Sequence, residues 1–383
     1  MAEVRTDRRA GSQGLHGAVT AILMLGVLGG CFGPEPETPP LKVAGVTKWY
    51  EGRSFAISIN LDGGALDFRT ENDWLIEQGL FLDYEIVSLA YDEQPVARSY
   101  LLDTLTTHGF GYFGHGHGHV NHDALGYDGA LASFSLNHAR MLAYGATPVS
   151  YAYPEGMGRQ AATQKAVREA WFYAARSFQE DPDGHGPYIM SGNAQTPRNW
   201  YLLPTLRMED SAATGCYDGC TNNSVEFFAH LENAEQREAW VISTYHGIGY
   251  DGQTDGRPVG WGFYKRQNFY TDMLRVRELR DAGRLWLARM DDVVRYVRQR
   301  DAAEVSLRTI EPDVHELTVN HPLDSSIFNH PMTIRLELGP QYWGKALRVT
   351  HPDYAEVPAG LMTPDGLLVN VSPSARPYRL EVL

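Results

Sequence analysis

The sequence has few cysteines, an excess of acidic over basic side chains, and one long apolar stretch. Lysine and arginine number 33 against 47 acidic residues, so the net charge is −14 and the pI is near 5.4. Binding of nucleic-acid phosphates needs a basic face, so we expect no nucleic-acid partner. Beyond the N-terminus no segment approaches the roughly 18–20 apolar residues that span a bilayer. The 383 residues, 43% hydrophobic, predict a large domain plus a smaller one.

The N-terminal residues have the pattern of a targeting segment. Arg5, Arg8 and Arg9 precede the short apolar run "AVTAILMLGVLGG" (18–30), and Cys31 follows it. "LGGC" resembles the bacterial lipobox, whose cysteine is lipidated, although an ordinary signal peptide or a single anchor helix would have similar features. We expect a signal peptide at 1–30 and a Pro-rich tether at 31–50, where "FGPEPETPP" cannot pack. The mature protein is then exported and attached to the envelope by lipid.

The other two cysteines, Cys216 and Cys220, lie in "GCYDGC". In an exported protein this spacing favours a local disulfide over a metal or redox site. A zinc site would need two more ligands nearby, and no neighbouring residue is a histidine.

Apolar strand patterns alternate with helical patterns between residues 51 and 301. This alternation indicates parallel βα units, in either a barrel or a doubly wound sheet. Strands are expected at 53–64, 83–91, 148–156, 239–247 and 285–290, and helices at 96–109, 128–145, 159–178, 268–283 and 291–300.

The pattern changes at about residue 302. "VSLRTIE", "MTIRLEL", "KALRVTH", "GLLVNV" and "PYRLEVL" alternate apolar and polar residues between Pro and Gly punctuation. We therefore expect residues 302–383 to form a small antiparallel β domain resembling a sandwich.

Reactive side chains follow three of the expected strands. The first strand ends at Asp62, a third strand runs into the stretch "GYFGHGHGHVNHD" (111–123) with its four histidines, and "WVISTY" ends at His246. In parallel α/β folds, catalytic and ligand-binding residues lie at the carboxyl ends of the strands. An Asp and several His are the ligands of a zinc-like ion, although Asp62 alone could be part of a turn and a His-rich tract can bind metal adventitiously.

The spacing of the histidines distinguishes among them. In a continuing strand His115, His117 and His119 share one face, whereas in a helical turn His115 and His119 are neighbours and His117 points away. His115 and His119 therefore fit a shared metal in either geometry. His122 is a candidate third ligand or a partner of a ligand.

Four motifs in this order resemble polysaccharide deacetylases of carbohydrate esterase family 4, which share the NodB-homology domain. "INLDGG" (59–64) is similar to the family's T-F-D-D-G, and His115 with His119 is similar to its H-[ST]-x-x-H. "YAYPEG" (151–156) and "STYHG" (243–247) are similar to its Pro-Tyr-Gly and Leu-x-His strand ends. The resemblance covers about residues 51–300.

The resemblance implies a distorted (β/α) barrel at 51–301 that removes acetyl groups from N- or O-acetylated polysaccharide or peptidoglycan with a divalent metal, commonly zinc. The implied metal ligands are Asp62, His115 and His119, and His117 and His122 are possible further ligands. Asp62 and His246 are the implied catalytic residues. The substrate-binding residues implied by "YAYPEG" are Tyr153, Pro154 and Glu155.

The family's paired aspartates correspond to one aspartate here. Either Leu61 replaces the base and Asp62 remains a ligand, or Asp62 is the base and Gly63 replaces the ligand. A catalytically inactive, glycan-binding lipoprotein is therefore the alternative function. "GHGH" (114–117) also resembles calcineurin-like phosphoesterases, but their Gly-Asn-His motif is absent from the sequence.

Overall fold

The computed structural model describes residues 41–178, 186–210, 216, 219–250, 253–254, 257–258, 262–357 and 365–383. The expected signal peptide and Cys31 lie outside these residues. Contacts group residues 39–383 into one compact unit. Among the described residues, none of the helices is both long and apolar enough to cross a bilayer.

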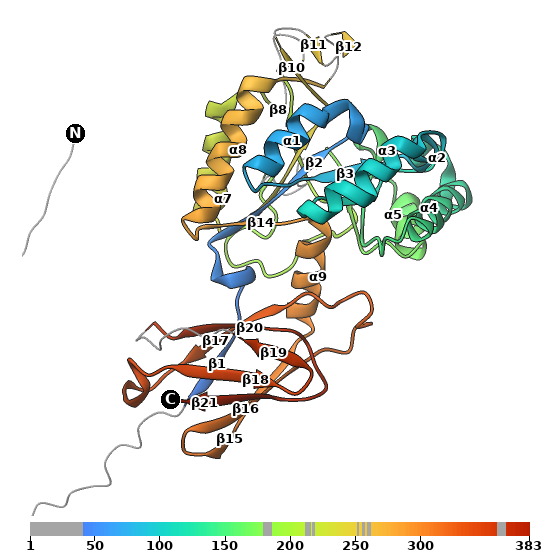
Figure 1. Ribbon diagram of the computed structural model, residues 1–383. Helices are drawn as coiled ribbons and strands as arrows, with labels where there is room; N and C mark the ends of the chain where they lie inside the picture. The colour runs from blue at the N-terminus through green and yellow to red at the C-terminus, as the bar shows by residue number, and fades with distance from the viewer. Residues whose placement is uncertain are drawn as a thin grey trace, which may run out of the picture. The chain divides into compact units, whose positions relative to one another are not determined.

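A parallel sheet forms the larger part of the fold (Figure 1), in the order β6-β5-β4-β3-β2-β9-β7-β8, with β14 also paired to β2. A parallel bridge between Arg176 and Leu203 joins β6 to the segment that leads into β7, so the sheet curls toward closure. This confirms the expected α/β class and the distorted barrel. The strands are β2 (Phe55–Leu61), β3 (Asp83–Ile86), β4 (Gly111–Gly114), β5 (Ser150–Ala152), β6 (Ala174–Arg176), β7 (Leu206–Met208), β8 (Cys220–Thr221), β9 (Trp240–Tyr245) and β14 (Leu285–Leu287).

The central strands are buried on both faces. All seven residues of β2 and all six of β9 are buried, which matches their nearly continuous apolar sequences. Side chains on the core face of these strands pack with Phe68, Leu75 and Phe269 from the surrounding helical segments. The carboxyl ends of β2, β4 and β9 are thereby fixed beside one another.

Helices flank this sheet, with α7 and α8 on one side in Figure 1 and α2 to α5 on the other. The expected strand at 83–91 is shorter than predicted, because β3 ends at Ile86 and a helix begins at Ser88. The expected helix at 96–109 is divided into α3, a π-helical turn and a 3₁₀ turn. The helices are α1 (Arg69–Glu77), α2 (Ser88–Glu93), α3 (Pro95–Ser99), α4 (Gly126–Ala143), α5 (Ala161–Glu169), α7 (Ser224–Gln236), α8 (Arg266–Asp281) and α9 (Met290–Asp301).

A small sheet follows His246, in the order β12-β11-β10-β13. β10 and β13 are parallel, and this pairing brings Gly262 against the chain at Gly247. Its strands are β10 (Gly247–Tyr250), β11 (Gln253–Thr254), β12 (Arg257–Pro258) and β13 (Phe263–Lys265).

The C-terminal segment forms two antiparallel sheets, as its alternating sequence predicted, and one of them also includes a strand from residues 42–46. One has the order β15-β16-β21-β18-β19 and the other the order β1-β17-β20. Alternate residues of both sheets, such as Leu317, Ile334 and Val369, share one cluster of buried side chains. The strands are β1 (Lys42–Val46), β15 (Glu304–Glu311), β16 (Val314–Asn320), β17 (Met332–Glu337), β18 (Leu347–His351), β19 (Tyr354–Val357), β20 (Leu367–Val371) and β21 (Tyr378–Val382).

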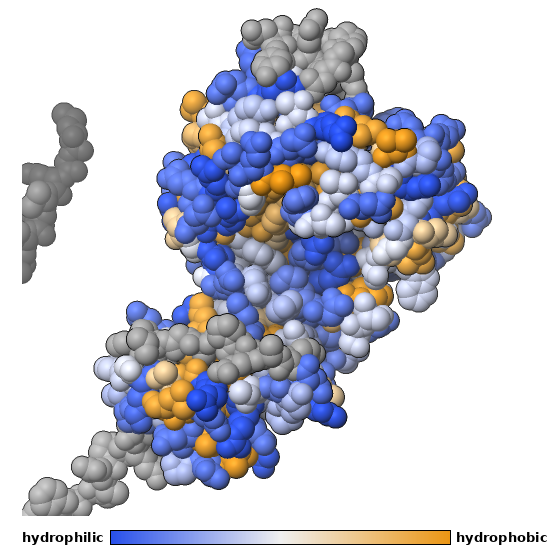
Figure 2. Space-filling view, in the orientation of Figure 1, coloured by the Kyte–Doolittle hydropathy of each residue, from blue (hydrophilic) through white to orange (hydrophobic). Residues whose placement is uncertain are grey.

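Strand β1 corrects the expected extent of the tether, which was placed at 31–50. Residues 42–46 pair with β17 over Lys42↔Glu337 to Val46↔Ile334. The sequence "KVAGV" has no helical spacing, and its backbone groups complete one edge of the three-stranded sheet. On the face drawn in Figure 2, hydrophilic residues predominate and hydrophobic ones form small scattered patches.

Candidate active site

Three of the predicted site residues meet at the carboxyl ends of β2, β4 and β9. The Oδ2 of Asp62 lies 3.1 Å from the Nε2 of His115 and 3.4 Å from the Nε2 of His246. The backbone N–H of Asp62 donates to Tyr245 at the end of β9, at 2.9 Å. His115 and His246 are buried, and Asp62 is 17% exposed. Strands far apart in the sequence thus supply one cluster.

Burial and charge oppose each other in this cluster. Burial alone would raise the pKa of Asp62, but the charges and hydrogen bonds of His115 and His246 hold that pKa well below its ordinary value. Burial would lower the pKa of His115, yet the carboxylate of Asp62, followed by that of Glu85, raises it. Asp62 is therefore a carboxylate at neutral pH.

His119 completes the donor set. One ligand atom from each of Asp62, His115 and His119 can be chosen such that all three lie within 4.8 Å of one another. The rings of His115 and His119 lie edge to face with centroids 5.0 Å apart. His119 adopts a φ of +50°, a left-handed conformation that is uncommon outside glycine and is concentrated at functional sites. Burial, and next His115, lower its pKa, which favours the neutral imidazole that a metal binds.

His117 and His122 do not join this group. The Nδ1 of His117 lies 3.0 Å from the Oγ of Ser88. The ring of His122 stacks on Phe134 with centroids 4.2 Å apart, and its Nε2 lies 3.0 Å from the Oγ of Ser133. Burial lowers the pKa of His122 to about 4, so its imidazole is neutral where it stacks on Phe134. Residues 115–119 form neither a strand nor a helix, but His115 and His119 are neighbours and His117 lies apart, as the helical alternative predicted.

A pocket of about 470 Å³ contains the cluster. Tyr153 and Glu155 line it, whereas Pro154 is buried beneath and is not among the lining residues. Glu155 has a φ of +59° and its Oε2 accepts a hydrogen bond from the Nδ2 of Asn121 at 3.1 Å. The residues that line this pocket are Asp62, His115, His119, Tyr153, Glu155, Gly156, Met157, Arg159, Arg176, Phe178, Arg207 and His246.

Sequence reasoning missed a buried ion pair behind His115. Arg176 on β6 and Glu85 on β3 have fully buried side chains. The Nε of Arg176 donates to the Oε1 of Glu85 at 2.9 Å, and its Nη2 donates to the other oxygen. That second oxygen lies 3.6 Å from the Nδ1 of His115, which is also 3.0 Å from the carbonyl oxygen of Ala152. The available signal was the presence of charged residues in the short strands "DYEI" and "AAR".

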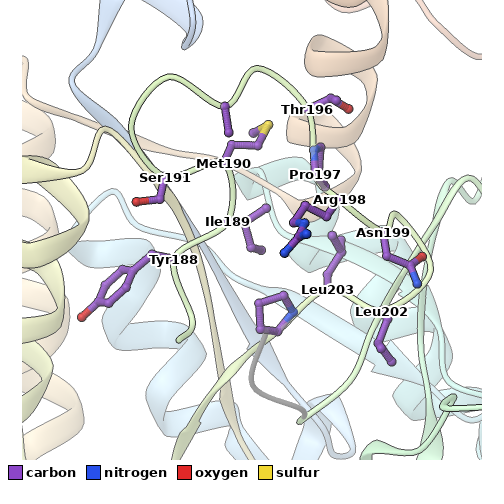
Figure 3. A pocket seen from close by; sticks show the side chains of 12 residues that line it. Tyr188, Ile189, Met190, Ser191, Thr196, Pro197, Arg198, Asn199, Leu202 and Leu203 are labelled. Atoms are coloured by element: carbon purple, nitrogen blue, oxygen red, sulfur yellow. The ribbon is translucent and has the colours of Figure 1, made fainter. Parts of the chain in front are cut away.

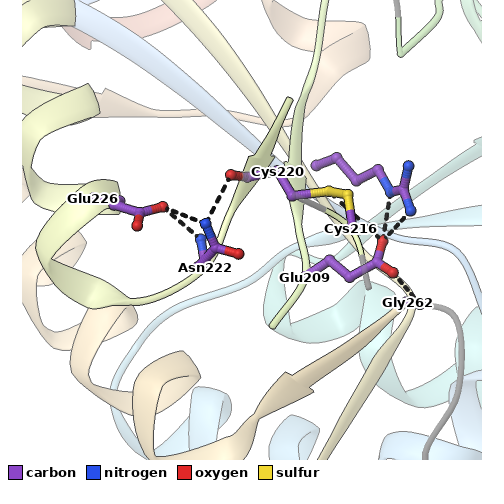
Figure 4. Close-up of a disulfide and its surroundings, with 7 residues drawn as sticks. Glu209, Cys216, Cys220, Asn222, Glu226 and Gly262 are labelled. Atoms are coloured by element: carbon purple, nitrogen blue, oxygen red, sulfur yellow. Dashed lines mark hydrogen bonds and ion pairs between the residues drawn. A yellow bond between two sulfur atoms is a disulfide. The ribbon is translucent and has the colours of Figure 1, made fainter. Parts of the chain in front are cut away.

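A second missed network surrounds Glu209, which follows β7. Its carboxylate accepts hydrogen bonds from Arg207 and from the backbone N–H of Gly262, the latter at 3.0 Å. Gly262 packs on His246, because a Cβ at that position would lie 2.5 Å from the Cβ of His246. The structure joins Cys216 and Cys220 in a disulfide beside Glu209 (Figure 4).

Another pocket, of about 120 Å³, lies along residues 188–204 (Figure 3). Its lining is mainly apolar and includes Ile189, Met190, Leu202 and Leu203. None of its described lining residues is a carboxylate or a histidine, so general acid–base groups gather at the Asp62 pocket and not here.

Comparison with known proteins gives low identities throughout. No known family profile matches the sequence. A gellan lyase of a Bacillus species is 22% identical over 199 residues, which are 51% of this chain but 7% of that protein. The match thus spans a small part of the lyase.

Solved structures that are similar include polysaccharide deacetylases, as the motifs predicted. A protein of Mycobacterium smegmatis assigned as a polysaccharide deacetylase is 16% identical, with 72% of this chain and 100% of that chain covered and a TM-score of 0.48. A family 4 carbohydrate esterase from Streptomyces lividans is 12% identical, with 62% and 93% covered and a TM-score of 0.37. A family 4 pseudoenzyme from Bacillus anthracis is 8% identical, with 63% and 66% covered and a TM-score of 0.40. Because these scores are below 0.5, the fold assignment rests on the strand order of this chain.

Proposed function

We propose that the protein is a metal-dependent hydrolase that removes acetyl groups from an N- or O-acetylated polysaccharide. The observation that carries the proposal is the grouping of Asp62, His115 and His119 in one pocket with His246. A carboxylate with two imidazoles is a donor set for a catalytic divalent ion, most suitably zinc, that leaves a coordination position open. The resemblance of four ordered motifs to polysaccharide deacetylases supports the same reaction.

The low pKa of Asp62 and the lowered pKa of His119 favour the forms that bind metal. The pKa of His115 is raised, so binding of the ion there would release a proton. A bound zinc would polarise the acetyl carbonyl and lower the pKa of the attacking water. Glu85 and the carbonyl of Ala152 lie on the Nδ1 side of His115, which orients Nε2 toward Asp62.

The remaining pocket residues supply proton transfer. With Asp62 among the ligands and Leu61 buried in the core, the register in which Leu61 replaces the family's base is favoured. Glu155 is the other carboxylate among the described pocket residues, and we assign it the role of base. His246 is assigned as the acid. Glu155 takes a proton from the water as the water oxygen bonds to the acetyl carbon. The bond from that carbon to the sugar nitrogen or oxygen breaks, and His246 gives the leaving atom a proton. The products are acetate and the free amine or hydroxyl of the sugar.

Metal analysis paired with acetate release tests the reaction. The purified protein should hold one metal per chain and release acetate from acetylated chitooligosaccharide or peptidoglycan. Stoichiometric metal with no acetate from any acetylated glycan would support the alternative, a catalytically inactive glycan-binding protein. That alternative is favoured by the single aspartate of the "INLDGG" motif.

The site of action proposed is the bacterial cell envelope, with Cys31 lipidated and the barrel exported on its tether. The apolar run before "LGGC" and the absence of another spanning segment in the sequence support a membrane attachment made by lipid alone. Metabolic labelling with a fatty acid should mark the wild-type protein and not Cys31→Ser. If the wild-type protein is not labelled, residues 1–30 would instead be an ordinary signal peptide or an anchor helix.

A further inference from the structure

One buried donor in the pocket is not used by the reaction proposed above. Arg176 has a fully buried side chain and lines the pocket together with Asp62 and His246. Two of its three guanidinium nitrogens donate to the two oxygens of Glu85. Such a two-point pair fixes the plane of the guanidinium group and the direction of its third nitrogen.

The third nitrogen, Nη1, is buried and has no hydrogen-bond partner among the described residues. Leaving a charged donor buried without an acceptor is energetically costly, and nearly all such groups in native proteins are satisfied. Because Arg176 lines the pocket, an acceptor on a ligand bound there is the candidate partner of Nη1.

Neighbouring side chains hold Arg176 rigidly in this place. Its guanidinium carbon lies 4.7 Å from the ring centroid of Phe178, and that ring lies 5.5 Å from the ring of His246. On the other side, the Glu85 oxygen that Nη2 contacts is 3.6 Å from His115. Arg176 is therefore linked through Glu85 to His115 and through Phe178 to His246, and it lines the same pocket as these two histidines.

We propose that Arg176 Nη1 donates a hydrogen bond to an oxygen of the acyl group, first the carbonyl oxygen and then the carboxylate of the released acid. This inference rests on the proposed hydrolase function. A guanidinium suits an oxygen that becomes negatively charged, and a donor fixed in advance stabilises that charge without reorganisation. Glu85 supplies the fixed orientation.

A double variant that replaces both charged side chains by neutral ones distinguishes this role from structural support. Arg176→Gln with Glu85→Gln removes Nη1 and also leaves no unpaired buried charge, while Glu85→Gln alone retains Arg176. Acetate is titrated into each protein by calorimetry after its metal content has been measured. We expect the double variant to bind acetate at least 10-fold more weakly and to lose about 100-fold in kcat. Glu85→Gln alone loosens the orientation of Arg176 but keeps Nη1, so its loss of acetate affinity should be smaller than that of the double variant.

Wild-type acetate affinity in the folded double variant would overturn the inference. If the double variant does not fold, Arg176→Lys serves, because lysine keeps the charge opposite Glu85 but lacks the third nitrogen, and the same loss of acetate affinity is expected. Failure of the proposed function has a different signature. Wild-type protein would then release no acetate from any glycan, while the acetate titration would still report the contact with Arg176.

Discussion

The backbone of His119 places its imidazole beside His115, whereas His117, two residues earlier, contacts Ser88 on α2. Replacement of His115 or His119 by alanine should therefore remove a ligand, and replacement of His117 should not. We expect zinc affinity to fall by more than the roughly 10–100-fold typical of residues that only support a ligand. Zinc content after dialysis against a weak chelator measures this, with His117→Ala as the matched control. Equal zinc loss in all three variants would contradict the assignment.

Glu155 is the pocket carboxylate that remains once Asp62 is a ligand. The Glu155→Gln variant keeps the acceptor for Asn121 but cannot take a proton. We expect kcat to fall by about 10²–10⁴-fold with metal content unchanged, because general-base catalysis contributes that much. Steady-state acetate release measures the effect, and Asn121→Ala is the control, since it removes the contact and retains the carboxylate. Unchanged kcat in Glu155→Gln would exclude the residue as base.

At this scale the sequence predicted the reactive residues that directly follow strands and missed the ion pair whose two members belong to the strands β3 and β6 themselves. Asp62 and His246 follow apolar strands directly, so strand polarity alone brings them together. Arg176 and Glu85 are 91 residues apart, and only the curl of the sheet makes them neighbours. The departure of His117 also depended on Ser88, which the sequence had suggested to be in a strand.

Helix α4 fixes the histidine loop through one buried side chain. The Nδ2 of Asn137 donates to the carbonyl oxygen of Gly116 at 2.7 Å and to the Oγ of Ser88 at 3.2 Å. Asn137→Ala leaves these acceptors buried, so we expect a loss of about 1–3 kcal/mol in unfolding free energy and weaker zinc binding. Urea denaturation and zinc titration measure the two effects. Ser135→Ala, on the exposed face of the same helix, should change neither, and wild-type behaviour of Asn137→Ala would refute the anchoring role.

Helix α8 carries a buried acid that should make stability depend on pH. Burial raises the pKa of Asp272 from 3.8 to about 7, although the hydroxyls of Tyr264 and Tyr245 donate to its Oδ2 at 2.8 and 3.3 Å. The folded state thus holds a proton that the unfolded state releases near pH 4. The contribution of Asp272 to stability is fully present below that pH and is lost as pH rises through about 7, by roughly 4 kcal/mol.

Asp272→Asn should remove this slope, because asparagine accepts the tyrosine hydrogen bonds and does not ionise. Unfolding free energies from urea denaturation between pH 4 and 8 give the comparison. The exposed Asp281→Asn, at the end of the same helix, is the control and should retain the wild-type slope. A slope unchanged in Asp272→Asn would show that another group causes it.

In the whole molecule, the order of the strands along the chain differs from their grouping into sheets. Strand β1 lies before the barrel in sequence, yet it pairs with β17 in the C-terminal part of the chain. The division into residues 51–301 and 302–383 remains our proposal, with β1 assigned to the second part. Local patterns predicted both sheets well, but such long-range pairing is set by the partner strand and not by the five residues of β1.

A truncation series tests that assignment. A chain that begins at residue 39 keeps β1, whereas one that begins at residue 48 exposes the edge of β17 and uncovers part of its core. We expect the shorter chain to melt several degrees lower and the longer one to match the mature protein, as measured by thermal unfolding. Equal melting temperatures would show that β1 contributes little to stability.

The disulfide beside Glu209 has a consequence for how the protein should be prepared. Glu209, Cys216 and Cys220 have ligand atoms within 4.8 Å of one another. Once reduced, the two sulfurs become thiols that bind zinc as thiolates next to a carboxylate. Protein made in a reducing cytoplasm would then compete for zinc at a place unrelated to hydrolysis. One zinc per chain would count as occupancy of the Asp62 pocket only after thiol titration has shown that both cysteines are oxidised.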